Sequence, residues 1–153
     1  MADLTYRHAA AADLPFIVHL IAIDDFSGAR MDDPQGGDDP VYAKALSAIA
    51  ADPNQELFVA ERDGKPVGTF QLTYIPGIMR KGVWRGLIEG VHIAPSERNR
   101  GYGSAMMRWA LERCRQRGCG MVQLTSSKKR TDAHRFYCAL GFEQSHEGFK
   151  LFL

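Results

Sequence analysis

The residues whose types and spacing are best suited to chemistry lie in the stretch 88–104. There an apolar run is followed by a charged turn and then by an amphipathic pattern. This order predicts a strand, a turn and the first turns of a helix. Backbone N–H groups at the start of a helix bind phosphate where no side chain blocks the approach. Gly101 and Gly103 have no Cβ and tolerate positive φ, while Arg98 and Arg100 add positive charge. The stretch therefore predicts a phosphate-binding turn.

The glycine spacing separates this turn from two better known phosphate loops. It lacks the third glycine of the dinucleotide-binding fingerprint, and it lacks the Gly-Lys-Ser/Thr ending of a P-loop. Taken alone, Arg-x-x-Gly-x-Gly also suits a purely structural turn between a strand and a helix. The identity of a phosphate ligand therefore depends on the rest of the chain.

Hydrophobic periodicity predicts the elements that must position this turn. Expected strands cover residues 4–8, 57–61, 67–74, 83–93 (or from 82), 121–125, 142–144 and 149–152, and expected helices cover 13–24, 41–51, 104–117 and 132–140. This order predicts an α/β fold in one domain over residues 1–153. The central sheet is expected to be mixed and mainly antiparallel, with helices on its flanks.

Individual residues make parts of this prediction more specific. Asp63-Gly64 is the residue pair that a type I′ hairpin turn favours, and Gly90 is a suitable position for a β-bulge. Residues 24–40 are rich in Asp, Gly and Pro and form the least predictable segment. The apolar spacing of the helix at 41–51 predicts that it buries Val41, Ala45, Leu46 and Ile49.

The overall composition does not indicate a charged macromolecular partner. The chain has 153 residues, is 45% hydrophobic and carries a net charge of +1, which suits a buried core and indicates neither a nucleic acid nor a membrane partner. Cys114, Cys119 and Cys138 form no C-x-x-C pair, as expected for a reducing cytoplasm. The first residues lack a signal-peptide core, and no apolar run has the length of a membrane span. We expect a soluble cytoplasmic protein.

A second motif lies about a helix and a strand beyond the phosphate turn. It comprises Ala133-His134-Arg135-Phe136-Tyr137 followed by Gly141 and Phe142. In this order and at this distance, the two motifs resemble those of the Gcn5-related N-acetyltransferase (GNAT) family. The resemblance covers nearly the whole chain and is weakest between residues 24 and 52.

The resemblance implies a sheet that splays open between its fourth and fifth strands, with a cleft that holds the pantetheine arm of acetyl-CoA. In that family the arm hydrogen-bonds to the fourth strand like an added strand, and the pyrophosphate lies on the amides of the turn. The corresponding cofactor-binding residues are Val91, His92, Ile93, Arg98, Asn99, Arg100, Gly101, Tyr102, Gly103 and Ser104. No metal is expected, because His134 and Cys138 share one helix face without an evident third ligand.

Acetyl transfer to an amine requires removal of a proton from the acceptor. An alkyl ammonium with a pKa near 10.4 is almost fully protonated at pH 7, a deficit worth roughly 4.6 kcal/mol, so a base is useful. The resemblance assigns this role to Glu89, just before the expected bulge. A strand-end carboxylate that is exposed or paired with Arg85 is the structural alternative, and His92 is the alternative base.

The departing thiolate of coenzyme A needs a proton in return. A tyrosine with a pKa of about 10 can supply it to a thiolate of about 8.5 at little cost, and the resemblance places Tyr137 in this role. A core tyrosine is the alternative interpretation. Cys138 is adjacent, but no base for it is evident, so direct attack of the amine on the thioester is favoured over an acyl-enzyme.

One position departs from the pattern of the family. Many relatives have an asparagine three residues before Ala133, where this chain has Arg130, preceded by Lys128 and Lys129. A contact of that asparagine with the cofactor is therefore not expected here. The basic run could meet phosphates of coenzyme A or an anionic acceptor, although a solvated charged loop explains it equally.

The identity of the acceptor is left open by two opposing signals. Acidic pairs between residues 24 and 39 suit a cationic acceptor such as a polyamine, an aminoglycoside or a basic peptide. Arg80, Lys81 and Arg85 precede Glu89 and could instead bind a carboxylate or phosphonate, and Trp84 lines either the pocket or the core.

These observations predict an acetyl-CoA-dependent N-acetyltransferase that modifies a primary amine, with a small-molecule acceptor favoured. A protein-lysine or N-terminal acetyltransferase is the alternative enzyme, and a non-catalytic acetyl-CoA-binding regulator is the alternative outside catalysis. Dimers are common in the family, so a homodimer is a candidate assembly.

Overall fold

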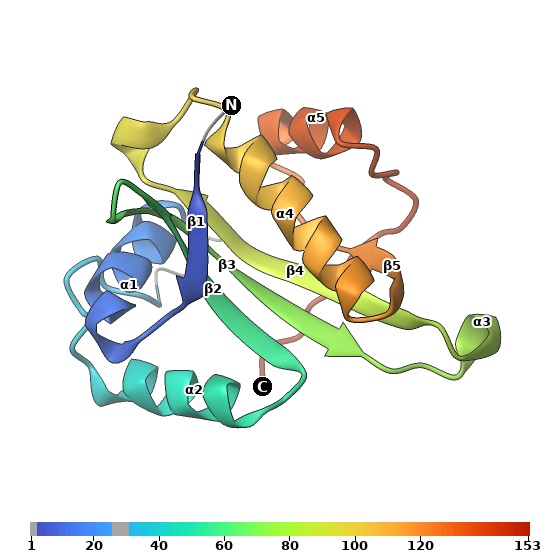
Figure 1. Ribbon diagram of the computed structural model, residues 1–153, viewed down its shortest axis with the longest axis horizontal. Coiled ribbons are helices and arrows are strands. Elements are labelled where there is room, and N and C mark those ends of the chain that lie inside the picture. The colour runs from blue at the N-terminus through green and yellow to red at the C-terminus, as the bar shows by residue number, and fades with distance from the viewer. Residues whose placement is uncertain (1–2, 26–30) are drawn as a thin grey trace.

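A computed structural model describes residues 3–25 and 31–153 of the chain and contains one five-stranded sheet (Figure 1). The strands lie side by side in the order in which they occur in the sequence: β1 (Thr5–His8), β2 (Gln55–Arg62), β3 (Lys65–Ile75), β4 (Trp84–Ile93) and β5 (Cys119–Gln123). The first four pair antiparallel, and β5 is parallel to β4. The mixed, mainly antiparallel sheet expected from the sequence is confirmed.

Helices cover both faces of this sheet. They are α1 (Leu14–Ile23), α2 (Pro40–Ala51), the short α3 (Met79–Gly82), α4 (Tyr102–Gln116) and α5 (Thr131–Ala139), with 3-10 turns at η1 (Ala11–Asp13) and η2 (Pro95–Glu97). Figure 1 shows α4 and α5 in front of the sheet and α3 at the far end of the β3–β4 hairpin. None of the described helices is long and apolar enough to cross a membrane.

The core follows from the alternation of side chains along the strands. Phe58, Phe70 and Leu72 point to one face, where they pack with Met106 and Met107 of α4. The opposite face is covered by the apolar side of α1, whose buried residues include Leu14, Ile17, Val18 and Leu20. Each of these side chains contributes about 1.5–3 kcal/mol by leaving water.

Two predicted turn features are confirmed. Asp63 and Gly64 have φ values of 50° and 74°, the positive pair that a type I′ turn requires. Gly90 has a φ of 58°, and it lies where Glu89 pairs with Gln71 but His92 pairs with Thr69. Strand β4 therefore carries one residue more than β3 between these pairs, which is a β-bulge.

The predicted opening between the fourth and fifth strands is also present. Strand β5 pairs with β4 only from Trp84 to Leu87. Residues 88–93 continue β4 without a strand partner on that side among the described residues. The two strands are thus joined at one end of the sheet and separate at the other, beside the N-terminus of α4.

Two expectations require correction. The described chain has no strand after Gln123, so residues 142–144 and 149–152 do not form the predicted strands. Alternating apolar residues give a segment the propensity for a strand, but a strand also needs a neighbour with which to pair, and the backbone N–H of Phe142 instead donates to the carbonyl of Tyr137 at 3.1 Å. Helix α2 buries no residue, and Val41 and Ala45 are exposed, because this helix contacts the sheet mainly along β2 and leaves its other sides in water.

Candidate active site

The predicted phosphate turn ends at the N-terminus of α4. Gly101 adopts the left-handed conformation with φ of 80°, and the first helical hydrogen bond runs from the N–H of Ala105 to its carbonyl at 3.1 Å. The amides of Tyr102, Gly103 and Ser104 precede that bond, so the helix itself does not use them. A Cβ built at Gly101 would meet no atom within 4 Å, so the approach to these amides is open. The turn therefore fits a diphosphate group.

The two arginines of the turn have carboxylate partners. Arg98 donates to both oxygens of Asp24 at 2.9 Å and to the carbonyl of Ile93 at 3.2 Å. Arg100 lies 3.4 Å from a carboxylate oxygen of Glu97. Arg98 thus fastens the turn to the end of α1 and to the end of β4.

Asp24 contacts His92 as well as Arg98. The Nδ1 of His92 lies 3.1 Å from its second carboxylate oxygen. Burial opposes ionisation of Asp24, yet the hydrogen bonds from His92 and Arg98 prevail, so the pKa of Asp24 lies below its usual value. Burial is also the largest influence on His92 and lowers the pKa of its ring, although Asp24 acts in the opposite direction. This ring is therefore buried, hydrogen-bonded and predominantly neutral at pH 7.

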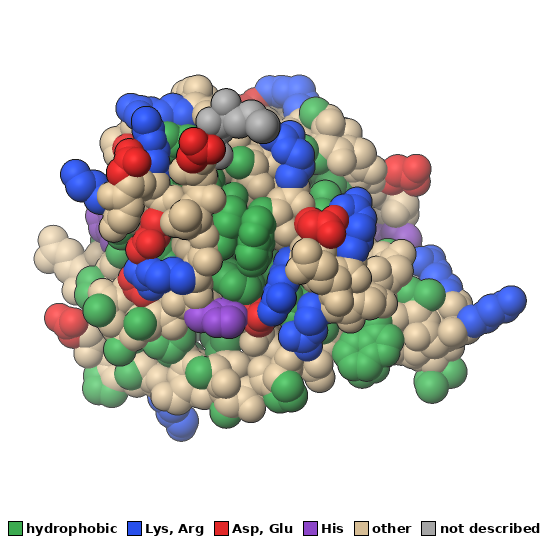
Figure 2. Space-filling view, viewed as in Figure 1, with side chains coloured by type: hydrophobic (Ala, Val, Ile, Leu, Met, Phe, Trp, Pro, Cys, Tyr) green, Lys and Arg blue, Asp and Glu red, His purple; other side chains and the backbone are tan. Residues whose placement is uncertain are grey.

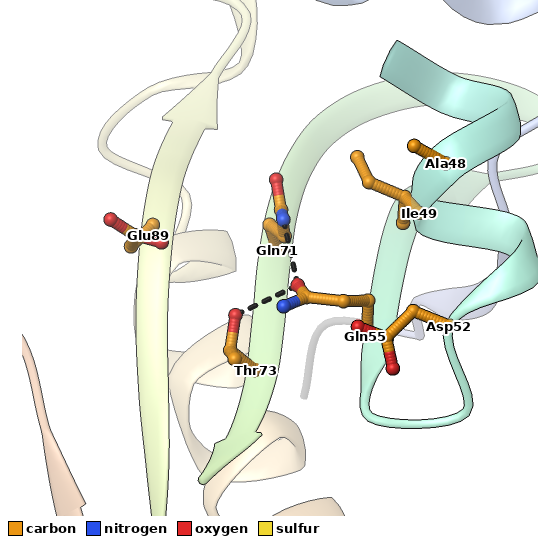
Figure 3. A pocket seen from close by; sticks show the side chains of 7 residues that line it. All are labelled: Ala48, Ile49, Asp52, Gln55, Gln71, Thr73 and Glu89. Carbon is orange, nitrogen blue, oxygen red and sulfur yellow. Dashed lines mark hydrogen bonds between the residues drawn. The ribbon is translucent and has the colours of Figure 1, made fainter. Parts of the chain in front are cut away.

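Glu89 lies on the other side of the bulge, in an open hollow of about 320 Å³ between α2 and the sheet (Figure 3). The hollow is lined by Ala48, Ile49, Asp52, Gln55, Gln71, Thr73 and Glu89. Within the described part of the chain, no hydrogen bond or ion pair engages the Glu89 carboxylate, which is exposed. The predicted alternative, a pair with Arg85, is not formed there. Glu89 is thus available to a molecule in the hollow.

An amide network forms the floor of this hollow. The side-chain oxygen of Gln55 accepts hydrogen bonds from Gln71 at 3.0 Å and from Thr73 at 2.8 Å. Figure 3 shows this network on β2 and β3, between Glu89 on β4 and the residues of α2. The amide nitrogen of Gln55 and the carboxylate of Asp52 add polar groups for a ligand.

Tyr137 lies on α5, half-buried between two aromatic rings. Its ring centroid is 5.2 Å from that of Phe136 and 6.0 Å from that of Phe142, both edge-on. Burial raises the pKa of the Tyr137 hydroxyl above its ordinary value, and the charge of Arg130 opposes this in part. The hydroxyl is therefore protonated at neutral pH, as a proton donor must be.

Arg130 precedes α5 and acts electrostatically on two candidate site residues. Its charge partly opposes the rise in the pKa of Tyr137 on α5 and adds to the lowering of the pKa of His92 on β4. Helix α5 also lies close to the start of α4, because a Cβ at Gly103 would come within 3.4 Å of the ring of Phe136.

The other predicted acceptor residues lie apart from this arrangement. Arg80 is on α3 and contacts the sulfur of Met121, and Trp84 begins β4 opposite Cys119. Figure 2 shows Lys and Arg side chains protruding at α3, while acidic and basic side chains are interspersed over the rest of this face. Arg85 is closer to the hollow, because it shares a face of β4 with Glu89. Its Nε atom is buried and has no hydrogen-bond partner among the described residues.

The second motif holds no cluster suited to a metal. The Nε2 of His134 lies 2.8 Å from the carbonyl oxygen of Ser127, and Cys138 is exposed. Within residues 3–25 and 31–153, no group of three or more His, Cys, Asp or Glu side chains could hold a metal ion.

An open parallel junction between β4 and β5, with a glycine turn at a helix N-terminus beside it, agrees with the architecture that the resemblance to the GNAT family implies. The model of the Acetyltransferase (GNAT) family matches residues 21–142, and the chain belongs to that family. It is an N-acetyltransferase by class, as its named relatives are.

Three similar proteins illustrate the relationship. An aminoalkylphosphonate N-acetyltransferase of Salmonella typhimurium is 34% identical over 105 residues, which cover 69% of this chain and 68% of the relative. A glucosamine 6-phosphate N-acetyltransferase of Trypanosoma brucei brucei is 37% identical over 60% of each chain. The crystal structure of a transcriptional regulator from Bacillus halodurans C-125 is 40% identical, covers 99% of this chain and all of its own, and has a TM-score of 0.91.

Proposed function

We propose that the protein transfers an acetyl group from acetyl-CoA to the primary amine of a small molecule bound in the hollow beside β4. The observation that carries this proposal is the unpaired carboxylate of Glu89, which stands at the hollow immediately before the bulge that separates it from the phosphate turn. A carboxylate without an internal partner is available to accept a proton from a bound ammonium group.

The donor side is assigned to the turn and to the free edge of β4. The amides at the end of the turn, up to Ser104, suit the diphosphate of acetyl-CoA, because the space beside Gly101 is open, whereas the N–H of Arg98 donates to the carbonyl of Pro95 at 3.4 Å. Residues Val91, His92 and Ile93 follow the bulge, where no strand among the described residues pairs with β4 on the side of β5. Their backbone groups are suited to hydrogen-bond the amides of the pantetheine arm as a neighbouring strand would.

The residues then divide the proton transfers between them. Glu89 takes a proton from the acceptor ammonium, directly or through water, and the neutral amine attacks the thioester carbonyl carbon. A C–N bond forms, the C–S bond breaks, and Tyr137 donates its proton to the departing sulfur. The acylated nitrogen then loses its surplus proton through solvent, and a proton from solvent restores the Tyr137 phenol. Neither step needs a covalent bond to the protein.

The acceptor is proposed to carry an anionic group as well as an amine. Glu89 on β4 and Asp52 beside α2 offer negative charge on opposite sides of the hollow, and the Nε of Arg85, on the same face of β4 as Glu89, is a buried donor without a partner among the described residues. An aminoalkylphosphonate or an amino sugar phosphate satisfies both charges, and relatives of these two kinds are named above. A volume of about 320 Å³ is also that of a small-molecule site.

The setting that we propose is the cytoplasm. All three cysteines are free, and Cys114 is fully buried, so the chain gains no stability from an oxidising environment.

The test is a measurement of coenzyme A release with confirmation of the acetylated product by mass spectrometry. The panel comprises aminoalkylphosphonates, amino sugar phosphates, amino acids, polyamines, aminoglycosides and lysine peptides. We expect turnover with acceptors that carry both charges and little with polyamines. Acetylation confined to lysine peptides would replace the small acceptor with a protein.

A regulator without catalytic activity is the second candidate, because the similar Bacillus halodurans structure is described as a transcriptional regulator. It predicts an increase in melting temperature with acetyl-CoA but no product from any amine. If acetyl-CoA neither reacts nor raises the melting temperature, the assignment of the donor site is wrong.

A further inference from the structure

His92 is a buried, titratable side chain whose ring has no role in the proton transfers assigned to Glu89 and Tyr137. Its side chain is 11% exposed, and its Nδ1 lies 3.1 Å from a carboxylate oxygen of Asp24. Asp24 is in turn held by two hydrogen bonds of 2.9 Å from Arg98. A carboxylate that holds the N–H of an imidazole fixes its tautomer and orientation and stabilises the imidazolium that forms on protonation.

The contact with Asp24 determines which ring nitrogen carries the proton. Burial opposes ionisation of Asp24, but hydrogen bonds from His92 and Arg98 keep its pKa below the usual value, so at pH 7 it is a carboxylate that only accepts hydrogen bonds. Burial lowers the pKa of His92, so its ring is neutral and has a single N–H. That N–H is therefore on Nδ1, and the lone pair of Nε2 is available. No hydrogen bond to Nε2 is formed within residues 3–25 and 31–153.

The β-bulge brings the imidazole to the face of β4 that carries Glu89. Glu89 pairs with Gln71 of β3, and His92 pairs with Thr69. Gln71 and Thr69 are two residues apart, so they and the residues opposite them share one face of the sheet, and two strand residues span only about 7 Å. In a regular strand, positions 89 and 92 would point to opposite faces. The extra residue at the bulge therefore makes the carboxylate and the imidazole neighbours.

The chemistry of acetyl transfer has a use for two neighbouring bases. The acceptor enters as an ammonium with three N–H bonds, and the amide product of a primary amine keeps one. Once Glu89 has taken the first proton, its carboxyl group is neutral and cannot take the second. The nitrogen that has attacked the thioester still carries a positive charge and two N–H bonds. A second base beside it prevents the adduct from expelling the amine again.

We propose that Nε2 of His92 is this second base, and that Asp24 is a positioning residue that fixes the ring in the tautomer required. The inference rests on the proposed acetyltransferase function. As the adduct collapses, an N–H bond of the acylated nitrogen breaks, its electron pair stays on nitrogen, and an Nε2–H bond forms. The C–S bond breaks and Tyr137 protonates the sulfur. The imidazolium then releases its proton to water, so the surplus proton reaches solvent by way of His92.

The charged groups around the ring keep it available as a base at neutral pH. Burial lowers its pKa most strongly, Asp24 raises it, and the charges of Arg130 before α5 and Arg98 in the turn lower it. Glu89 lies on the same face of β4. The pKa of His92 thus stays below the ordinary 6.5, and the ring is lost as a base only as the pH falls below that value.

The first test is His92→Asn, assayed with an acceptor that the enzyme turns over. The amide nitrogen of asparagine takes the place of Nδ1 and can still donate to Asp24, but nothing replaces Nε2. We expect the melting temperature and the Kd for acetyl-CoA to be retained and kcat to fall at least about tenfold. The matched control is His19→Asn, at an exposed position of α1 whose Nδ1 lies 3.3 Å from the carbonyl oxygen of Pro34, and its kcat should be unchanged.

The outcomes separate this inference from the proposed function. A wild-type kcat in His92→Asn, measured where the chemical step limits turnover, would overturn the second base and leave the acetyltransferase standing. If the wild-type chain acetylates no acceptor, both fall together.

Nitrogen-15 NMR of the wild-type chain with acetyl-CoA tests the tautomer without an acceptor. We expect the proton of His92 on Nδ1 at pH 7, a titration midpoint below 6.5, and a decline of kcat toward acid pH with the same midpoint. In Asp24→Asn both midpoints should shift to lower pH, because Asp24 raises the pKa of the ring. A proton on Nε2, or a kcat profile that does not follow the NMR midpoint, would overturn the proposal.

Discussion

The Tyr137 side chain is held between Phe136 and Phe142, and this packing determines what its hydroxyl can do. Burial raises the pKa of that hydroxyl, so it stays protonated over the whole neutral range. Such a group can deliver a proton to a thiolate but cannot act as a base. We therefore expect Tyr137→Phe to bind acetyl-CoA normally and to lower kcat by about 10²–10⁴-fold.

Single-turnover kinetics measures this effect, and thermal shift with acetyl-CoA measures binding. Tyr6→Phe is the matched control, because Tyr6 is on β1, at the opposite border of the sheet from β5. Equal rates for Tyr137→Phe and the control, with a substrate whose chemical step limits turnover, would remove Tyr137 from the mechanism.

Glu89 differs from Tyr137 in being exposed and without an internal partner. In Glu89→Gln the acceptor must lose its proton to solvent, and the fraction of neutral amine rises tenfold for each unit of pH below its pKa of about 10.4. We expect kcat/KM to fall by about 10²–10⁴-fold at pH 7 and to recover as the pH rises. The control Glu112→Gln, on the exposed side of α4, should leave the pH dependence of kcat/KM unchanged. If kcat/KM of Glu89→Gln does not recover as the pH rises, Glu89 is not the base.

At the scale of the elements, local signals determine the turns but not the contacts between distant segments. The conformations at Asp63-Gly64, Gly90 and Gly101 were predictable, because each needs a positive φ that few residues adopt. Asp24 was not, since its partners His92 and Arg98 lie 68 and 74 residues further along the chain. Only the fold brings α1 to the bulged end of β4.

Residues 149–152 show where the sequence-based prediction was wrong. The pattern of residues 149–152 predicted a strand, and the propensity is present, but a strand exists only when another strand pairs with it. Periodicity reports what a segment favours and carries no information about the neighbour.

The turn before α4 provides a prediction at this scale. Gly101→Val introduces a β-branched side chain at φ of 80°, where such a residue is strained, and points its Cβ into the open approach to the amides. We expect the Kd for acetyl-CoA to rise at least tenfold while the far-UV circular dichroism is retained. Gly64→Val, in the β2–β3 hairpin at a φ of 74°, imposes comparable strain away from the site. A Kd changed equally by both would show that strain, and not access to the amides, is responsible.

At the scale of the whole molecule, one buried carboxylate ties several elements together. Glu56 on β2 accepts hydrogen bonds from Arg113 of α4 at 2.5 and 3.0 Å, contacts His8 of β1 at 3.0 Å, and accepts a hydrogen bond from the hydroxyl of Tyr74 on β3. Burial raises its pKa, but these partners prevail and lower it to about 2 from an ordinary 4.5. This network was not predictable from the sequence, because the partners of Glu56 lie 18 to 57 residues away along the chain.

This lowered pKa makes stability depend on pH in a defined direction. The unfolded chain binds the proton more readily, so the contribution of Glu56 is complete above pH 4.5 and is lost as the pH falls toward 2. We expect Glu56 alone to cost about 2 kcal/mol between pH 7 and pH 3. Urea unfolding at the two pH values measures the loss, which should be smaller in Glu56→Gln. Parallel losses in the variant and the wild type would assign the acid sensitivity to other groups.

Helix α2 takes no part in the network around Glu56. It buries none of its residues, yet Ala48 and Ile49 form one wall of the hollow in which the acceptor is proposed to bind. Surface substitutions away from a core usually change stability by less than about 0.5 kcal/mol. This wall can thus vary during evolution while β4, the glycine turn and the core remain as they are. New acceptor preferences are accessible to this scaffold through α2 at little risk to its folding.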